Sequence, residues 1–124
     1  IYDIGCGDGR FVYIAANDYL AKATGIELSP IVHLLAIIRK LVWRSKAQIV
    51  LADFKMCNLS DADVIFCYLL PDSLKKIQPA LDHQLKPGTK IFSYAFEIPT
   101  WKLIHREERD PKINLAPVYV YEKI

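Results

Sequence analysis

Glycines at the start of the chain have the spacing of a ligand-binding turn. Gly5, Gly7 and Gly9 follow Asp3 within seven residues, directly behind a short apolar stretch. Because glycine carries no side chain, such a turn lets a ligand approach the main chain closely. The segment from Asp3 to Gly9 is therefore the first candidate binding site.

Three further polar side chains each lie at or near the end of an apolar segment. They are Glu27, Asp53 and Tyr68. A carboxylate accepts hydrogen bonds from hydroxyl or amino groups, and the face of a tyrosine ring attracts a cation. These residues form one site with the glycine turn only if the apolar segments are neighbouring strands.

The apolar pattern predicts strands and helices in regular alternation. The first helix ends near Asn17 or Asp18, Ser29 and Pro30 begin the second, and Pro71 begins the third, which Pro79 would bend or interrupt. The second helix carries a stripe of Ile31, Leu34, Leu35, Ile38, Leu41 and Val42 and runs to about Arg44. Predicted strands cover residues 1–4, 22–28, 48–53, 62–70 and 90–96.

Strands that are apolar on both faces and alternate with helices predict a parallel sheet with helices on each side. In such sheets, ligands bind at the carboxyl ends of the strands. The first four predicted strands end at the glycine turn, Glu27, Asp53 and Tyr68. The sequence therefore predicts an α/β domain with these groups along one edge of its sheet.

The tail departs from this alternation. Only residues 97–100 separate the fifth predicted strand from residues 101–107, and a parallel return usually needs a dozen or more residues. We therefore predict that residues 101–107 run antiparallel beside the fifth strand. Residues 116–124 then pair back as a hairpin at the sheet edge, with residues 109–114 closing the turn. Val118, Val120 and Glu122 would share one face, opposite Tyr119, Tyr121 and Lys123.

Composition restricts the function classes. The net charge of +2, with 24% charged residues, gives no strong nucleic-acid signal. The basic residues from Arg39 to Lys46 fit the end of a helix, where cations are favourable. No apolar run reaches the roughly 18 residues of a transmembrane segment. A single domain over residues 1–124 is expected, with an upstream segment missing because residue 1 already lies in a predicted strand.

The cysteines favour a reducing, cytoplasmic location. Cys6, Cys57 and Cys67 are odd in number and widely spaced. They form no Cys-x-x-Cys pair and have no nearby histidine pair, so we expect reduced thiols and no metal site.

Two cofactor classes compete for the glycine turn. A dinucleotide turn needs a small residue where this chain has Arg10, which disfavours a nicotinamide-dependent oxidoreductase. The spacing of Asp3, Gly5, Gly7 and Gly9 instead resembles motif I of the class I S-adenosylmethionine-dependent methyltransferases. This resemblance implies a Rossmann-like class I methyltransferase sheet, mostly parallel with an antiparallel C-terminal hairpin, and S-adenosylmethionine as the cofactor.

The resemblance assigns roles to residues at the later strand ends. Glu27, 18 positions beyond Gly9 (27 − 9), matches the acid that holds the ribose hydroxyls. Asp53 matches the acid that accepts from the adenine amino group, and Leu28 and Phe54 would offer apolar surface to the adenine ring. Taken alone, Glu27 could be a surface carboxylate and Asp53 a strand-end cap.

A narrower resemblance rests on "GCGDGR", "GIELSP" and "YLLP". These phrases are similar to those of the small protein-lysine methyltransferases related to the mitochondrial enzymes that modify bioenergetic proteins, and of their microbial relatives. The implied partner is a protein whose lysine accepts the methyl group. Tyr68 is then the candidate catalytic residue, because it could steer the lysine; alternatively it only packs.

Two other readings remain open beside lysine methylation and the oxidoreductase. The domain could bind the cofactor without catalysis, or transfer the methyl group to RNA or a small molecule.

Overall fold

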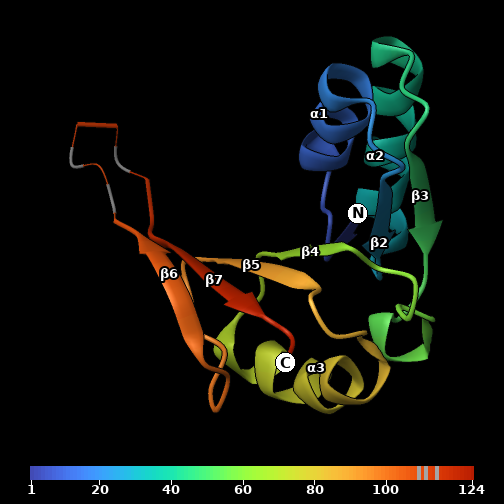
Figure 1. The fold of residues 1–124 in the computed structure, drawn as a ribbon. Coiled ribbons are helices and arrows are strands. Elements are labelled where there is room, and N and C mark those ends of the chain that lie inside the picture. Colours follow the sequence, from blue (N-terminus) through green and yellow to red (C-terminus); the bar gives the residue numbers. More distant parts are fainter. Residues whose placement is uncertain (109, 111, 114) are drawn as a thin grey trace. The chain divides into compact units, whose positions relative to one another are not determined.

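The computed structural model describes residues 1–108, 110, 112–113 and 115–124. It divides into two compact units, Ile1–Cys57 and Asn58–Ile124. Most elements of both units are labelled in Figure 1.

The first unit is a parallel sheet with two helices. Its strands have the order β3-β2-β1, because β2 pairs in parallel with both β1 and β3. A short 3-10 turn follows β3. The elements are β1 (Tyr2–Ile4), α1 (Arg10–Tyr19), β2 (Thr24–Glu27), α2 (Pro30–Trp43), β3 (Gln48–Leu51) and the turn η1 (Phe54–Met56).

The core of the first unit forms around α1. Val12 and Tyr13 are fully buried and pack with Ala23 and Ala47, which lie just before β2 and β3. The Tyr13 hydroxyl donates a hydrogen bond to the carbonyl of Ala36 in α2. This buried bond fixes the two helices of the unit to each other.

Helix α2 begins as the sequence predicts. Ser29 accepts a hydrogen bond from the Val32 amide over 3.4 Å, and Pro30 is the first helical residue. The helix ends at Arg44, which adopts a left-handed conformation.

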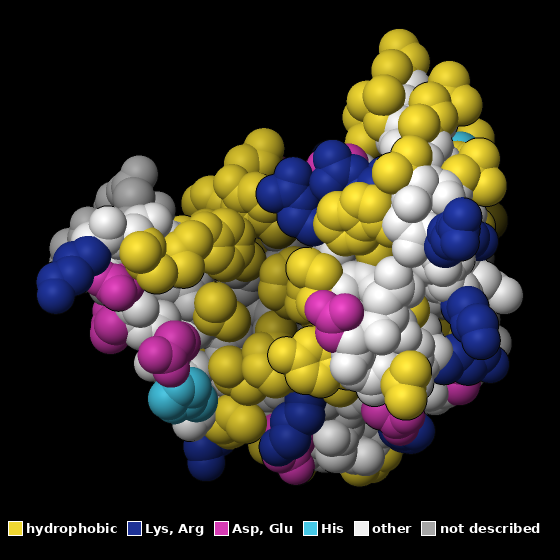
Figure 2. All heavy atoms as spheres, turned by 90° about the horizontal axis from the view of Figure 1, so that it is seen from above, with side chains coloured by type: hydrophobic (Ala, Val, Ile, Leu, Met, Phe, Trp, Pro, Cys, Tyr) yellow, Lys and Arg dark blue, Asp and Glu magenta, His cyan; other side chains and the backbone are white. Residues whose placement is uncertain are grey.

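The apolar stripe of α2 is exposed, although an apolar stripe normally faces a core. Ala36 is the buried residue of this helix. Figure 2 shows hydrophobic side chains gathered at its upper right, on the side where Figure 1 places α2. The exposed residues of the stripe, here called the α2 face, are Ile31, Leu34, Leu35, Ile38, Leu41 and Val42.

The second unit combines a parallel pair with an antiparallel hairpin. Its strand order is β4-β5-β7-β6: β4 and β5 are parallel, and β7 runs antiparallel to both β5 and β6. None of the helices described in either unit has the length and apolarity needed to cross a membrane. The elements are β4 (Val64–Cys67), α3 (Pro71–Gln84), β5 (Lys90–Tyr94), β6 (Leu103–Glu107) and β7 (Val118–Glu122).

Helix α3 continues through Pro79 as one helix, so Pro79 does not interrupt it. Leu74 and Ile77 before the proline and Leu81 after it are all buried. Burial of this face on both sides of Pro79 offsets the missing hydrogen bond.

The predicted position and direction of residues 101–107 are both wrong, because β6 lies beyond β7 and runs in the same direction as β5. The strand that pairs antiparallel with β5 is β7, in which Val120 lies opposite Phe92, and β6 pairs with β7 on its other side. The antiparallel pairing of β6 with β7 confirms the hairpin. Of the residues expected to close it, Arg109, Pro111 and Asn114 lie outside the described part of the chain.

The path of the link between β5 and β6 explains this strand order. Gln78 of α3 donates to the carbonyl of Pro99, and the Ile98 amide donates to the Tyr121 hydroxyl over 2.9 Å. Trp101 donates to Asp82 over 2.7 Å. These bonds hold the link, which turns at Pro99 and Thr100, against α3 and β7, and the chain returns to the sheet without a connecting helix.

The faces of β7 follow the predicted alternation. The Tyr121 ring and the Lys123 ammonium both contact the Trp101 ring, whereas Glu122 pairs with Lys90 on the other face.

Candidate functional site

The glycine turn joins the end of β1 to the start of α1. The amides of Gly5 and Cys6 both donate to the carbonyl of Ile26 in β2, over 2.8 and 3.0 Å. The Gly9 amide donates to the Cys6 carbonyl over 3.0 Å. The turn is therefore held against the neighbouring strand by backbone hydrogen bonds.

Gly7 and Gly9 serve different purposes within this turn. Both have positive φ, 57° and 79°, which disfavours other residues. A Cβ atom at Gly9 would lie 2.6 Å from the Tyr13 ring, whereas one at Gly7 would meet nothing within 4 Å. Gly9 thus allows the core of the unit to pack, and Gly7 faces open space.

The Glu27 carboxylate joins the turn to the start of α2. Its Oε2 atom accepts from the Gly7 amide over 2.9 Å, and its Oε1 atom accepts from the Ser29 amide over 3.1 Å. A carboxylate has about four acceptor positions, so each oxygen keeps one for another donor. The side chain is held with acceptor capacity free beside the open space at Gly7.

Asp3 is a buried acid in β1, with 3% of its surface exposed. Burial, and secondarily the negative charge of Glu27, raise the pKa of Asp3 from 3.8 to about 7. The carboxylates of Asp3 and Glu27 therefore interact electrostatically next to the glycine turn.

The remaining candidates of the first unit lie at the ends of β2 and β3. The Ala52 amide donates to the Glu27 carbonyl over 3.0 Å, so these strand ends are adjacent. Leu28, which is 61% exposed, and the half-buried Phe54 follow them. The structure thus brings Asp3, Gly5, Gly7, Gly9 and Glu27 together at the turn, with Leu28, Asp53 and Phe54 at the neighbouring strand ends.

Asp53 caps the turn that follows β3, which is the structural alternative to its expected role in binding adenine. Its Oδ1 atom accepts from the Lys55 amide over 3.0 Å, and Oδ2 lies 3.7 Å from the Lys55 ammonium. These contacts leave acceptor positions free, so capping and ligand binding are compatible.

The sequence did not reveal a contact between the glycine turn and α2. The Asp8 carboxylate lies 3.2 Å from the Arg39 guanidinium, whose carbon lies 5.3 Å from the centre of the Trp43 ring. Arg39 fits the end of a helix by its charge alone, and only the folded structure shows its partner. A groove of about 500 Å³ runs here, lined by Asp8, Leu35, Ile38, Arg39, Val42 and Trp43.

Tyr68 lies in the second unit, one residue beyond β4. Its side chain is 58% exposed. The ring centre lies 5.0 Å from that of Tyr94 at the end of β5, with the planes at 80°. Tyr68 is thus exposed at the carboxyl end of its strand and has one aromatic neighbour on the adjacent strand.

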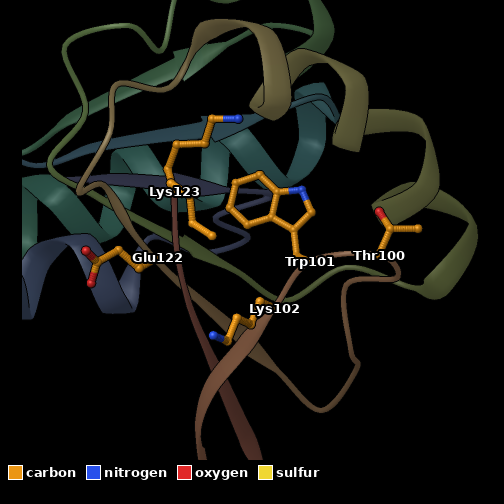
Figure 3. A pocket seen from close by; sticks show the side chains of 6 residues that line it. Thr100, Trp101, Lys102, Glu122 and Lys123 are labelled. Atoms are coloured by element: carbon orange, nitrogen blue, oxygen red, sulfur yellow. The ribbon is translucent and has the colours of Figure 1, made fainter.

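A separate hollow lies at the other end of β5. Glu122, one of its residues, pairs with Lys90 at the start of that strand. Because ligands of α/β sheets bind at the carboxyl ends of strands, this hollow is not a candidate for the cofactor site. Its volume is about 160 Å³, and Ile124 lines it together with the residues labelled in Figure 3, which are Thr100, Trp101, Lys102, Glu122 and Lys123.

No group of three or more histidine, cysteine or acidic side chains among the described residues could hold a metal ion.

The parallel β3-β2-β1 order, the β4-β5-β7-β6 order and the glycine turn define the class I fold of S-adenosylmethionine-dependent methyltransferases. A solved structure titled as an RNA methyltransferase from Salinibacter ruber in complex with S-adenosyl-L-homocysteine matches with a TM-score of 0.89. It is 30% identical, and the match covers 98% of this chain and 78% of that one. The chain belongs to the ANTKMT methyltransferase domain family, whose model matches residues 3–105.

Two curated relatives carry more specific names. A protein-lysine N-methyltransferase of Saccharolobus islandicus is 39% identical over 82% of this chain, which spans 65% of that protein. The adenine nucleotide translocase lysine N-methyltransferase of Mus musculus is 31% identical over 81% of this chain, which spans 44% of it. The chain therefore spans less than two thirds of the length of either relative.

Proposed function

We propose that this chain performs S-adenosylmethionine-dependent methyl transfer to a lysine side chain of a protein. The observation that carries the cofactor assignment is the Glu27 carboxylate, fixed by the Gly7 and Ser29 amides beside open space. The lysine acceptor rests on the two curated relatives, both named as lysine N-methyltransferases.

The residues of the first unit have complementary roles toward the cofactor. Glu27 would accept hydrogen bonds from both ribose hydroxyls with its free acceptor positions. Asp53 would accept from the adenine amino group, while Leu28 and Phe54 would contact the adenine ring. Gly7 would let the ligand pass close to the main chain, and the ionised form of Asp3 would stabilise the positive charge of the methionine portion.

The protein's task in the reaction is mainly to align the acceptor and exclude water. The bound cofactor supplies an activated methyl group on a sulfonium. The lysine ammonium would first lose a proton to solvent, which frees the nitrogen lone pair to accept the methyl group, and the electron pair of the broken S–C bond would stay on sulfur. Tyr68 would steer the lysine, because its ring face attracts an ammonium and its hydroxyl accepts a hydrogen bond.

Calorimetric titration tests the cofactor assignment. S-adenosylhomocysteine should bind with one site, and NAD should not. Binding of NAD alone would support the oxidoreductase reading and contradict the proposal.

Transfer of a radiolabelled methyl group to a cell extract then tests the acceptor. The label should be removed by protease and appear in methyl-lysine after acid hydrolysis. S-adenosylhomocysteine binding without any transfer would support a binding module without catalysis.

RNA is the second candidate acceptor, favoured by the name of the Salinibacter ruber structure. In that case the label would be lost on treatment with ribonuclease and would resist protease. The same extract assay therefore separates the two acceptors.

We further propose that the protein works in a reducing, cytoplasmic compartment. Its three cysteines are free thiols, and Cys6 and Cys67 are buried. Labelling of the thiols in intact cells before and after lysis would test this.

A further inference from the structure

Tyr68 and Tyr94 occupy matching positions on neighbouring strands. Strands β4 and β5 are parallel, and Cys67 lies opposite Ser93 at the last pair of their register. Tyr68 is the next residue beyond Cys67, and Tyr94 is the next beyond Ser93. Both rings therefore emerge at the carboxyl ends of adjacent strands, the edge where α/β sheets bind ligands.

The two rings contact each other in a defined geometry. Their centres are 5.0 Å apart and their planes are nearly perpendicular. Edge-to-face contact of this kind is a favoured arrangement of aromatic rings. Because Tyr68 is 58% exposed, this contact leaves much of its surface open to a ligand.

Tyr94 is itself held by the segment that precedes β7. The Ala116 amide donates to the Tyr94 hydroxyl over 3.1 Å, and the Ala95 amide donates to the Pro117 carbonyl over 2.8 Å. Tyr94 also lies opposite Val118 in the β5–β7 register. Tyr94 is thus held both by its hydroxyl and by the pairing of its backbone in β5. Tyr68 lies one residue beyond β4 and lacks this backbone pairing.

We propose that Tyr94 is a positioning residue that holds the Tyr68 ring in the orientation that receives the lysine side chain. This inference rests on the proposed function, because it assumes that the acceptor is a lysine. An ammonium group is attracted to an aromatic face only when it can lie over that face, so the orientation of Tyr68 decides how well the acceptor is aligned. Tyr94 would act on the acceptor through the Tyr68 ring.

Steady-state kinetics of the full chain test this role, with a bacterial protein extract as the acceptor. Tyr94→Leu should lower kcat/KM for the extract about two- to tenfold, the range expected for loss of an aromatic pair. The affinity for S-adenosylhomocysteine should stay within about twofold of wild type. Tyr94→Phe keeps the ring and should retain most activity.

The double variant separates positioning from general damage. If Tyr94 acts through Tyr68, Tyr94→Leu should cause little further loss in a Tyr68→Leu background. Independent, multiplicative losses would overturn the inference. Trp101→Leu is the matched control, because Trp101 makes a similar edge-to-face contact with Tyr121, at 6.4 Å and 86°. It should leave kcat/KM unchanged.

A binding measurement tests the role of Tyr94 even if no methyl transfer is detected. n-Butylammonium imitates the end of a lysine side chain, and its addition with S-adenosylhomocysteine should shift the Tyr68 ring signals in NMR spectra. Tyr94→Leu should weaken that response, and an unchanged response would overturn the role of Tyr94. Absence of transfer by the wild type, with S-adenosylhomocysteine still bound, would instead contradict the proposed function.

Discussion

Glu27 accepts a hydrogen bond from the backbone amide of Gly7, 20 positions away in the sequence, over 2.9 Å. This bond joins the end of β2 to the turn that follows β1. It places a charged acceptor beside the glycine whose missing side chain leaves the space open. The carboxylate and the turn therefore act as one unit, and changes to either should affect the same ligand.

Glu27→Ala should weaken S-adenosylhomocysteine binding at least about tenfold, because two hydrogen bonds to a charged group, each worth ~1.5–3 kcal/mol, would be lost. Calorimetry gives the affinity, and circular dichroism verifies the fold. Asp18→Ala removes an exposed acid of α1 and serves as the control. Normal affinity in a folded Glu27→Ala protein would remove Glu27 from the site.

Substitution of Gly9 should mainly lower stability, whereas substitution of Gly7 should mainly reduce cofactor binding. Gly9→Ala should lower the melting temperature strongly, because its Cβ would overlap the Tyr13 ring. Gly7→Ala should cost only about 1 kcal/mol of stability through its positive φ, yet reduce cofactor binding. Gly7→Val should abolish binding. If Gly7→Ala binds S-adenosylhomocysteine normally, the turn is only structural.

Asp3 should make stability fall as pH rises. Its pKa is about 7 in the folded protein and 3.8 in the reference state, so between these values the folded state holds a proton that the unfolded state has lost. The free energy of unfolding should fall by at most about 4 kcal/mol, and the fall should be complete above pH 7. Urea unfolding from pH 4 to 8 measures it, and Asp3→Asn should flatten the slope.

The same acid should make cofactor binding depend on pH. A cationic ligand favours ionised Asp3, so affinity for S-adenosylmethionine should increase between pH 6 and pH 8 and release protons. Calorimetry in buffers of different ionisation enthalpy detects that release. Equal proton release by wild type and Asp3→Asn would show that another group is responsible.

Polar substitutions on the α2 face should cost little stability. Leu34 and Leu41 are 58% and 72% exposed, so Leu34→Gln and Leu41→Gln should change the free energy of unfolding by no more than about 0.5 kcal/mol. They should also raise solubility. Leu74→Ala in α3, which is fully buried, is the contrasting control and should cost about 2–5 kcal/mol. A large loss at Leu34 or Leu41 would mean that the face is covered in solution.

Local signals in the sequence were sufficient for most elements. Ser29 and Pro30 mark the start of α2 because capping and proline geometry are local effects. The glycine turn and Glu27 follow from spacing, since parallel strands end at one edge. Their hydrogen bond needs the register of β1 and β2, which spacing alone does not specify.

The missed features depend on contacts between residues distant in sequence. The order of β6 and β7 is set by bonds from α3 and β7 to the link around Pro99, and the pattern of residues 101–107 contains no sign of them. The stripe of α2 showed which side chains share a face, but periodicity does not say what covers that face. Tyr94 lies inside the predicted fifth strand of residues 90–96, and only the register of β4 and β5 shows that it matches Tyr68.

Strand β6 also bears on how the protein avoids aggregation. All five of its residues are exposed, and within the described part of the chain it pairs with β7 alone. Such an edge presents free backbone groups that could recruit a strand from another molecule. His105 lies 3.1 Å from Glu107, and Arg106 lies 3.0 Å from Glu108, so polar and charged side chains occupy the second half of the strand. Another chain would have to strip water from these charges before it could add to the sheet, which protects the folded protein against fibre growth from this edge.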